Sequence, residues 1–406
     1  MTLNHPGRWL SIVGIGEDGL DGLSPAARRA IDGARLLVGG ARHLAHVPAG
    51  GCERLAWPSP LTDAIPAILA RRGEAVVVLA SGDPLHFGVG TTLARHVPAE
   101  EMLVLPAPSA FSLAAARLGW AQQDATLVSL HGRALQAIVP HVQPGRRVLA
   151  LTWDGTTPAR VAALLTERGF GPSRLIVLEA MGGPRERRLE TTAETFDLDG
   201  IDPLNLLAIE MIAAPGARPV PFTAGLDDAF FENDGQLTKR EIRAVTLAAL
   251  APCHGETLWD IGLGAGSVAI EWLLRDPSLA AIGIEERADR AERARRNALA
   301  LGVPRLEIVT GAAPEALAGM PTPDAVVIGG GAGDPGVLAA ARDRLRPGGR
   351  LVVNGVSLET EAILLEAFKT FGGDLVRIGV DRVATVGAMH GWRPAMPVLQ
   401  WRWHKP

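Results

Sequence analysis

The chain has 406 residues, 47% hydrophobic and 21% charged, which is enough for two or three domains with large apolar cores. Its net charge of −4 provides no overall basic field, so we expect no nucleic-acid partner. Two distant cysteines, Cys52 and Cys253, exclude a disulfide framework or a zinc cluster, and His43 and His46 have no further ligand at metal spacing, so no metal is expected. The N-terminal stretch resembles no secretory signal, and no apolar run approaches the roughly 20 residues of a membrane span. We therefore expect a cytoplasmic protein without a membrane partner.

In chain order, short β-branched or Leu-rich runs alternate with Ala-rich amphipathic stretches, which is typical of α/β architecture. In the first half we expect strands at 9–14, 35–38, 75–80, 102–105, 126–130, 147–152, 174–180 and 204–211. Helices are expected at 25–32, 61–72, 110–118 and 158–168.

The first strand runs into "SIVGIGEDG", in which Gly14, Gly16 and Gly19 have the G-x-G-x-x-G spacing of dinucleotide-binding loops. Such a site also needs a helix directly after the loop and an acid after the second strand. Here "LDGL" precedes the helix cap at Ser24, and the second strand ends in two glycines. We therefore reject a dinucleotide and interpret Gly14 and Gly16 as a tight turn at the mouth of a cleft, nearer to substrate than to an adenosine.

Further turns follow later strands of this half: "SGDPLHFGVG", "LPAPSAFSL", "SLHGR" and "EAMGGPRERR". This ordered set resembles the tetrapyrrole methylase family over about residues 8–212; one departure is Glu17-Asp18, where the family often has Pro-Gly-Asp. The resemblance implies a two-lobed domain that methylates a tetrapyrrole with S-adenosyl-L-methionine (SAM). It places around SAM the residues Gly82, Asp83, His86, Ser109 and Ala110.

A Pro-, Gly- and Asp-rich stretch, 213–236, interrupts the α/β pattern, and we interpret it as a linker between domains at 1–212 and 237–406. Beyond it we expect a helix at 238–250, a strand at 256–261, and continued βα alternation. The second strand of this half ends at Glu285, 19 residues after Gly266. An acid there can accept hydrogen bonds from both ribose hydroxyls of an adenosine.

The glycine loop "DIGLGAG" follows the strand at 256–261 and leads directly into a helix, so its backbone can approach a ligand closely. This spacing resembles the first motif of Rossmann-like SAM methyltransferases, which implies a Rossmann-like sheet with helices on both faces. We expect Asp260 to organise the loop. The resemblance assigns to the cofactor site Thr238, Gly262, Gly264, Gly266, Glu285 and Ala313.

Together the two halves resemble the bifunctional, decarboxylating precorrin methyltransferases of cobalamin biosynthesis. That resemblance implies methylation of ring carbons 5 and 15, loss of the ring-C acetate carboxylate as carbon dioxide, and one SAM site per domain. Methyl transfer mainly requires alignment in a dry cleft, and the chain shows no nucleophile triad or carboxylate pair, so no catalytic residue is assigned. Because a precorrin carries many carboxylates, arginines should bind it, although a solvated surface role is equally open for each. The substrate candidates are Gly14, Gly16, His131, Arg133, Arg185, Arg382 and Arg393.

Two alternatives stay open from the residues alone. In one, only the C-terminal domain is an active SAM-dependent methyltransferase, on another substrate, and the N-terminal half is a docking scaffold. In the other, the C-terminal domain modifies RNA or protein; the absent basic stripe argues against RNA. Both families favour homo-oligomers, so we also expect a homo-oligomer.

Overall fold

The computed structural model describes residues 7–406. Residues 1–6 of the N-terminal stretch, in which we expect no secretory signal, lie outside the described residues. The chain forms two compact units. The first extends to Leu135 and resumes over His141–Arg218; the second contains Gln136–Pro140 and Pro219–Pro406. The stretch expected as a linker is thus divided, with 213–218 in the first unit and the remainder in the second.

The first unit begins with a five-stranded parallel sheet of order β3-β2-β4-β1-β5. Its strands are β1 (Leu10–Ile15), β2 (Leu36–Gly39), β3 (Glu53–Ala56), β4 (Val76–Ser81) and β5 (Met102–Leu105). The helices between them are α1 (Pro25–Asp32), α2 (Ala41–Ala45), α3 (Ile65–Leu69) and α4 (Val89–Leu93), with 3-10 turns η1 (Gly19–Gly22), η2 (Leu61–Ala64) and η3 (Ala99–Glu101). Successive side chains of β1 and β4 enter two different apolar clusters, so both faces of the sheet are buried and its strands are continuously apolar.

A second sheet of order β6-β7-β10-β8-β9 completes this unit, and only β6 and β7 pair in parallel. Its strands are β6 (Ala125–Ser129), β7 (Arg147–Leu151), β8 (Arg174–Glu179), β9 (Arg187–Thr192) and β10 (Asn205–Glu210). The associated helices are α5 (Ala110–Leu118) and α6 (Thr157–Glu167), with η4 (Gln122–Asp124). The 3-10 turn η5 (Leu135–His141) follows β6 in the chain, and its residues Gln136–Pro140 belong to the second unit. Helix α5 begins at the Ser109 cap and packs Phe111 and Ala114 against this second sheet.

The second unit contains a seven-stranded sheet of order β13-β12-β11-β14-β15-β19-β16, with only β19 antiparallel to its neighbours. Its strands are β11 (Thr257–Ile261), β12 (Ala280–Glu285), β13 (Glu307–Thr310), β14 (Ala325–Ile328), β15 (Arg350–Gly355), β16 (Asp374–Ile378) and β19 (Val398–His404). The helices are α7 (Arg240–Leu250), α8 (Ser267–Leu273), α9 (Ala288–Ala300), α10 (Val337–Arg344) and α11 (Leu358–Phe371), with η6 (Asp228–Phe230) and η7 (Glu315–Leu317). Strand order reverses at β11, and ligands of open α/β sheets bind in the crevice at such a point.

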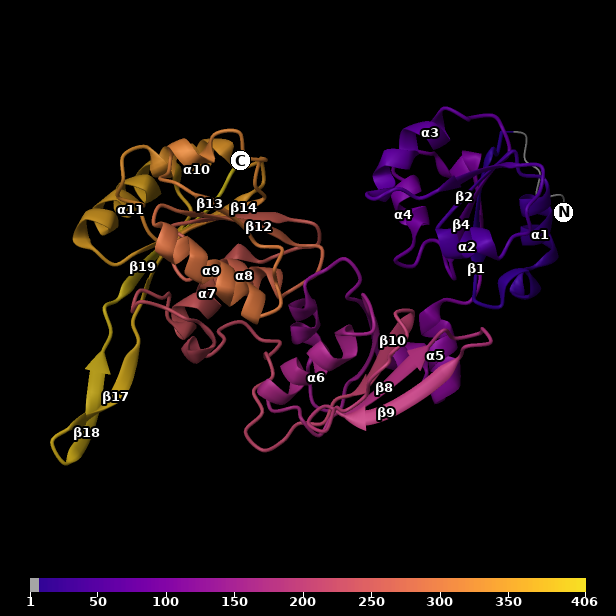
Figure 1. Ribbon diagram of the computed structural model, residues 1–406. Helices are drawn as coiled ribbons and strands as arrows, with labels where there is room; N and C mark the ends of the chain where they lie inside the picture. Colours follow the sequence, from indigo (N-terminus) through magenta and orange to yellow (C-terminus); the bar gives the residue numbers. More distant parts are fainter. Residues whose placement is uncertain (1–6) are drawn as a thin grey trace. The chain divides into compact units, whose positions relative to one another are not determined.

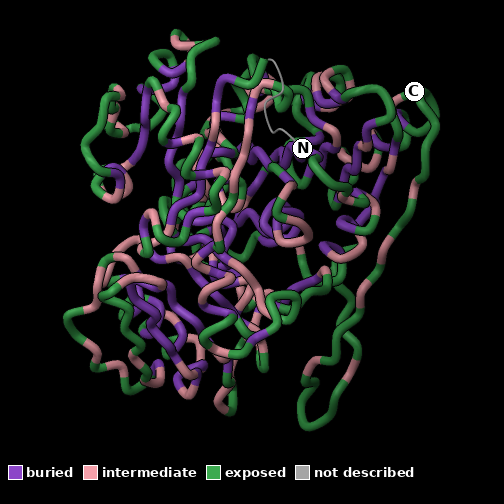
Figure 2. The backbone as a smooth tube through the Cα atoms, turned by 90° about the vertical axis from the view of Figure 1, so that its right-hand side faces the viewer, coloured by how far each residue is buried: buried purple, intermediate pink, exposed green. Residues whose placement is uncertain are grey.

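A separate hairpin, β17 (Asp381–Val386) and β18 (Met389–Pro394), projects from this unit as the yellow ribbon in Figure 1. Figure 2 shows that the hairpin is exposed along most of its length, whereas central strands of the sheets, such as β4 and β14, are buried.

The α/β class and the expected strands of the first half are confirmed, each to within about two residues. Strands β3 and β9 were not expected because their sequences, "ERLA" and "RRLETT", carry no apolar periodicity. The continuous helix expected at 61–72 is wrong: η2 is followed by the short α3. Pro66 supplies no N–H and disfavours helix in the residues before it, which accounts for the break.

Within residues 7–406, no helix is both long and apolar enough to cross a membrane.

Candidate functional site

In the second unit, the glycine turn after β11 is joined to the end of β12 through Glu285. The N–H groups of Gly262 and Leu263 both donate to the Ile284 carbonyl at 3.0 Å. The buried Glu285 carboxylate accepts the Gly264 N–H on Oε2 at 2.8 Å and the Arg287 N–H on Oε1 at 3.0 Å. The turn and the acid thus form one hydrogen-bonded unit, and each carboxylate oxygen keeps a free lone pair.

The three loop glycines differ in what a side chain would meet at each position. Gly262 has a φ of +74°, and a Cβ there would lie 2.7 Å from the Gly330 carbonyl oxygen. Gly264 also has a positive φ, but a Cβ there would meet nothing nearer than 3.8 Å, so this glycine leaves open space beside the cavity. Gly266 does not line the cavity; it caps α8 and packs against α9, with Ala294 3.2 Å from its built Cβ.

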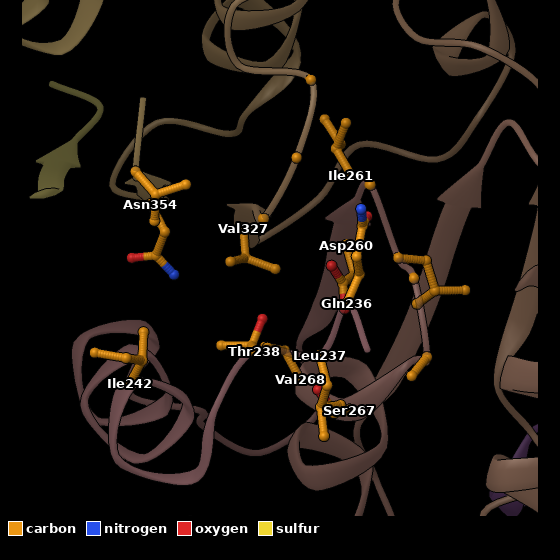
Figure 3. A pocket seen from close by; sticks show the side chains of 18 of the residues that line it. Gln236, Leu237, Thr238, Ile242, Asp260, Ile261, Ser267, Val268, Val327 and Asn354 are labelled. Atoms are coloured by element: carbon orange, nitrogen blue, oxygen red, sulfur yellow. The ribbon is translucent and has the colours of Figure 1, made fainter. Parts of the chain in front are cut away.

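A cavity of about 760 Å³ lies against this turn. The predicted residues that line it are Thr238, Gly262, Gly264, Glu285, Ala313 and Arg382. In Figure 3 Thr238 lies across the cavity from Val327, and Asp260 and Ile261 approach it from the end of β11. The structure therefore brings together residues that are up to 144 positions apart in the chain, from Thr238 to Arg382.

Asp260 is buried at the base of the cavity, where its Oδ2 accepts the Ala269 N–H at 3.1 Å. Burial raises the pKa of Asp260 to about 8; the neighbouring Glu285 charge adds to this, and the Ala269 hydrogen bond opposes it. The side chain is thus protonated at neutral pH. It ties the end of β11 to the first turn of α8, which agrees with the expected loop-organising role.

A buried ion pair that sequence reasoning missed holds the segment leading to Thr238. Arg243 and Glu271 are both fully buried, with Nε and Oε1 2.5 Å apart. Arg243 also donates to the carbonyls of Thr238 and Leu226, while Glu271 accepts the Gly225 N–H at 2.7 Å and the Leu226 N–H at 2.9 Å. An arginine on the apolar face of the helix expected at 238–250 was the signal that something buried pairs with it.

Asn354, also missed, lines the cavity with an amide of fixed orientation. Its Nδ2 donates to Thr246 Oγ1 at 3.0 Å, and its Oδ1 accepts from Gln400 Nε2 at 2.9 Å. Arg382 lines the same cavity and pairs with Glu241. Arg393 faces Arg382 across the hairpin but does not line the cavity.

The first unit contains a cavity of its own, of about 970 Å³, between the carboxyl ends of β1 and β4 and the second sheet. The predicted residues that line it are Gly16, Gly82, His86, Ser109, Ala110, His131 and Arg133. Three others do not: Gly14, Asp83 and Arg185.

Each of those three has a structural partner instead. A Cβ on Gly14 would collide with the Gly82 carbonyl oxygen, so this glycine allows two backbone segments to touch. The Asp83 carboxylate accepts the Leu85 N–H at 2.9 Å and shapes the turn. Arg185 pairs with Asp202, and its Nη2 lies 3.6 Å from Glu17 Oε2.

Polar residues of α2 form a cluster in this cavity that the sequence did not indicate. His43 Nε2 lies 3.0 Å from Ser81 Oγ and 3.1 Å from Arg42 Nη2, and Arg42 Nη1 lies 3.3 Å from Glu17 Oε1. Burial first, then the charge of Arg42, lowers the pKa of His43 to about 4. His43 is thus a neutral imidazole that accepts on Nε2, because a guanidinium can only donate.

Among residues 7–406 the structure has no group of three His, Cys, Asp or Glu side chains arranged to hold a metal ion. The two cavities are thus lined by backbone turns, the Glu285 carboxylate, side-chain amides and guanidinium groups. Such groups bind and orient an organic ligand.

Two family models match the two halves of the chain. Residues 10–197 match the tetrapyrrole (corrin/porphyrin) methylases, and residues 229–405 match a precorrin methyltransferase domain. The crystal structure of the C-terminal domain of precorrin-6Y C5,15-methyltransferase from Rhodobacter capsulatus is 45% identical, covers 46% of this chain and all of its own, and has a TM-score of 0.44.

Two curated relatives from Salmonella typhimurium each match less than half of the chain. The cobalt-precorrin-7 C(5)-methyltransferase is 37% identical over 180 residues, 44% of this chain and 88% of its own. The decarboxylating cobalt-precorrin-6B C(15)-methyltransferase is 30% identical over 178 residues, 43% of this chain and 92% of its own.

A curated relative from a Sinorhizobium species, a decarboxylating precorrin-6Y C(5,15)-methyltransferase, matches almost the full length. It is 55% identical over 400 residues, which cover 98% of this chain and 96% of the relative. The chain therefore belongs to the family of decarboxylating precorrin-6Y C(5,15)-methyltransferases.

Proposed function

We propose that this protein methylates ring carbons 5 and 15 of a precorrin and removes the ring-C acetate carboxylate as carbon dioxide, in cobalamin biosynthesis. Family membership implies SAM as the methyl donor. The observation that carries the proposal is that each compact unit has its own large cavity beside a glycine turn at the end of a parallel strand. The two half-length relatives, named for one ring position each, support a division of the two methylations between the units.

In the second unit we assign the SAM site to Thr238, Gly262, Gly264, Glu285 and Ala313. The free lone pairs of Glu285 suit two ribose hydroxyls, and the open space beside Gly264 suits a ligand in contact with backbone. We place Ala313, beyond β13, against the adenine, and Gly266 in a packing role. When bound, SAM supplies an electrophilic methyl group on a sulfonium.

In the first unit we assign the second SAM site to Gly82, His86, Ser109 and Ala110. These residues follow β4 and β5, whose carboxyl ends meet at one edge of the first sheet, and all four line its cavity. Asp83 acts beside them by shaping the Gly82 turn.

The precorrin is bound in both units by groups that match its carboxylates. We assign Arg133, with Gly16 and His131, to the first cavity and Arg382 to the second. The residues align the ring carbon with the methyl group in a largely apolar cleft. The macrocycle's conjugation accepts the electron pair left when carbon dioxide departs, so no strong side-chain base is required at that step.

We also propose a homo-oligomer in which the hairpin β17–β18 packs against a second copy. A two-stranded hairpin alone is marginally stable in water. This one exposes large apolar side chains, Val383, Val386, Met389 and Trp392, each at least 58% exposed. Burying them against a symmetric partner removes that apolar surface from water.

The test offers the whole chain a precorrin-6Y-type substrate with SAM carrying a 13C-methyl group. We expect two labelled ring methyl groups per macrocycle, one equivalent of carbon dioxide, and two SAM molecules bound per chain by calorimetry. One labelled methyl group and one bound SAM would instead show that the first unit is a docking scaffold. Labelling of RNA or protein and not of the macrocycle would overturn the proposal entirely.

A further inference from the structure

Phe87, in the loop after β4, has a backbone φ of 57°, a left-handed conformation that is rare for a bulky side chain. Phe87 is 43% exposed and lines the cavity of the first unit. Strained residues of this kind persist where the surrounding structure over-determines them, and they gather at binding sites. The left-handed backbone at Phe87 therefore requires a structural explanation and indicates a role in binding.

The cause is the tight closure of the loop on both sides of Phe87. The Asp83 side chain accepts the Leu85 N–H at 2.9 Å, and the Asp83 carbonyl accepts the His86 N–H at 3.2 Å. On the other side, Cβ atoms on Gly88 and Gly90 would lie 2.5 and 2.6 Å from the Pro84 carbonyl oxygen. Only glycine at positions 88 and 90 allows the backbone to pass this close to Pro84. The resulting turn directs the Phe87 ring into the cavity.

The ring meets the guanidinium of Arg133, which lies in the turn after β6, a strand of the second sheet of the same unit. The Arg133 Cζ atom lies 5.6 Å from the centre of the Phe87 ring, within the range of a cation–π contact. The turn that carries Arg133 is itself fixed, because the Leu130 carbonyl accepts both the Arg133 N–H at 3.0 Å and the Trp153 indole N–H. A π face attracts a guanidinium without using any of its N–H donors.

Arg133 also differs from the other cavity-lining cations in its charge balance. Among the residues that the structure describes, it forms no ion pair with a carboxylate. The other arginines and lysines that line the two cavities each have an acidic partner: Arg42 pairs with Glu17, Lys239 with Asp228, Arg290 with Asp234 and Arg382 with Glu241. An arginine without an acidic partner in a cavity has its bidentate donors available for a ligand carboxylate.

We propose that Phe87 is a positioning residue that holds the Arg133 guanidinium as the receptor for one peripheral carboxylate of the tetrapyrrole in the first unit. The proposal rests on the function proposed above. In this proposal the strained loop after β4, which belongs to the first sheet, fixes Arg133, which follows a strand of the second sheet. Phe87 also stacks on the His86 ring, with the ring centres 5.0 Å apart, so SAM binding is the readout that separates an effect through Arg133 from one through His86.

The test measures kcat and KM separately for each 13C-labelled ring methyl group, using the full chain. Arg133→Gln should raise the KM of one methylation about 30-fold, from the loss of charge-assisted hydrogen bonds, and leave the other methylation unchanged. Phe87→Leu should raise the same KM about 5-fold, whereas Phe87→Tyr keeps the aromatic face and the native KM. In the Phe87→Leu, Arg133→Gln double variant, the KM should equal that of Arg133→Gln alone.

The matched control is Phe371→Leu, because Phe371 is 41% exposed, forms a cation–π contact with Arg342 at 3.7 Å, and lines neither cavity. We expect native KM values for it. A full 5-fold Phe87 effect in the Arg133→Gln background would overturn the proposal, as would weaker SAM binding in Phe87→Leu or a native KM in Arg133→Gln. Failure of the proposed function is distinct, because the unaltered chain would then transfer no methyl group to the macrocycle.

Discussion

Replacing Glu285 by glutamine removes a negative charge from the SAM site proposed in the second unit, with almost no change in side-chain volume. The native carboxylate accepts the Gly264 N–H at 2.8 Å and the Arg287 N–H at 3.0 Å, one on each oxygen. Glutamine has one carbonyl oxygen, so it keeps one of these bonds and presents its NH2 group to the other N–H. We expect the glycine turn to lose part of its support where it borders the cavity.

The magnitude follows from the number of charge-assisted hydrogen bonds affected. A hydrogen bond to a charged group contributes about 1.5–3 kcal/mol, and an unsatisfied buried donor costs about 1–3 kcal/mol. If each of the two ribose hydrogen bonds loses about 1.5 kcal/mol, SAM binding weakens by about 3 kcal/mol, or about 150-fold in Kd.

Calorimetric titration of the whole chain with SAM measures this change. The unaltered chain should show two sites, and Glu285→Gln should weaken one of them about 150-fold and leave the other at native affinity. Glu307→Gln is the control, because Glu307 is exposed on β13 and does not line the cavity. Two sites at native affinity in Glu285→Gln would refute the ribose assignment, and equal weakening of both sites would refute two separate cavities.

Three further predictions concern stability and assembly. Gly14→Ala should destabilise the first unit by about 3 kcal/mol or more, because the new methyl group overlaps the Gly82 carbonyl oxygen. Urea unfolding measures this loss of unfolding free energy, and an unchanged unfolding midpoint would contradict the close contact. Because the folded-state pKa of Asp260 is raised to about 8, its contribution to stability is fully present below its unfolded pKa and is lost as pH rises toward 8. Asp260→Asn should therefore flatten the fall in unfolding free energy between pH 5 and pH 8, and an unaltered slope would show that another group titrates. Exchanging Met389 and Trp392 for serine should dissociate the oligomer in analytical ultracentrifugation with both methylations partly retained, whereas an unchanged sedimentation coefficient would place the interface elsewhere.

Much of the fold was predictable because both faces of two sheets are buried. Strands such as β4, "VVVLAS", read as continuous apolar runs, and such runs alternate visibly with amphipathic helices. Strand β9 was not predictable in this way, since its pairing with β8 is supported by ion pairs across the strands, Arg174 with Glu190 and Arg187 with Glu179. Local sequence does not show which distant strand supplies the opposite charge.

The same distinction holds for the candidate sites. Glu285 was predictable from the glycine turn because the acid and the loop end adjacent strands of one sheet, at a spacing that chain geometry sets. Asn354 and the cluster of Arg42, His43 and Ser81 were not predictable, because their partners lie 38 to 108 residues away or depend on a helix of only five residues.

The amino-acid sequence by itself determined the α/β class, the two glycine turns and the acid that follows the second. Whether a glycine faces a ligand or the protein's own backbone was decided only by the tertiary structure. A Cβ on Gly14 would strike Gly82, whereas Gly264 adjoins open space in the cavity, although Gly14 lies near the carboxyl end of β1 and Gly264 lies just beyond that of β11. The reason is physical: a glycine is required wherever the backbone meets something closely, and only the packed fold shows what it meets.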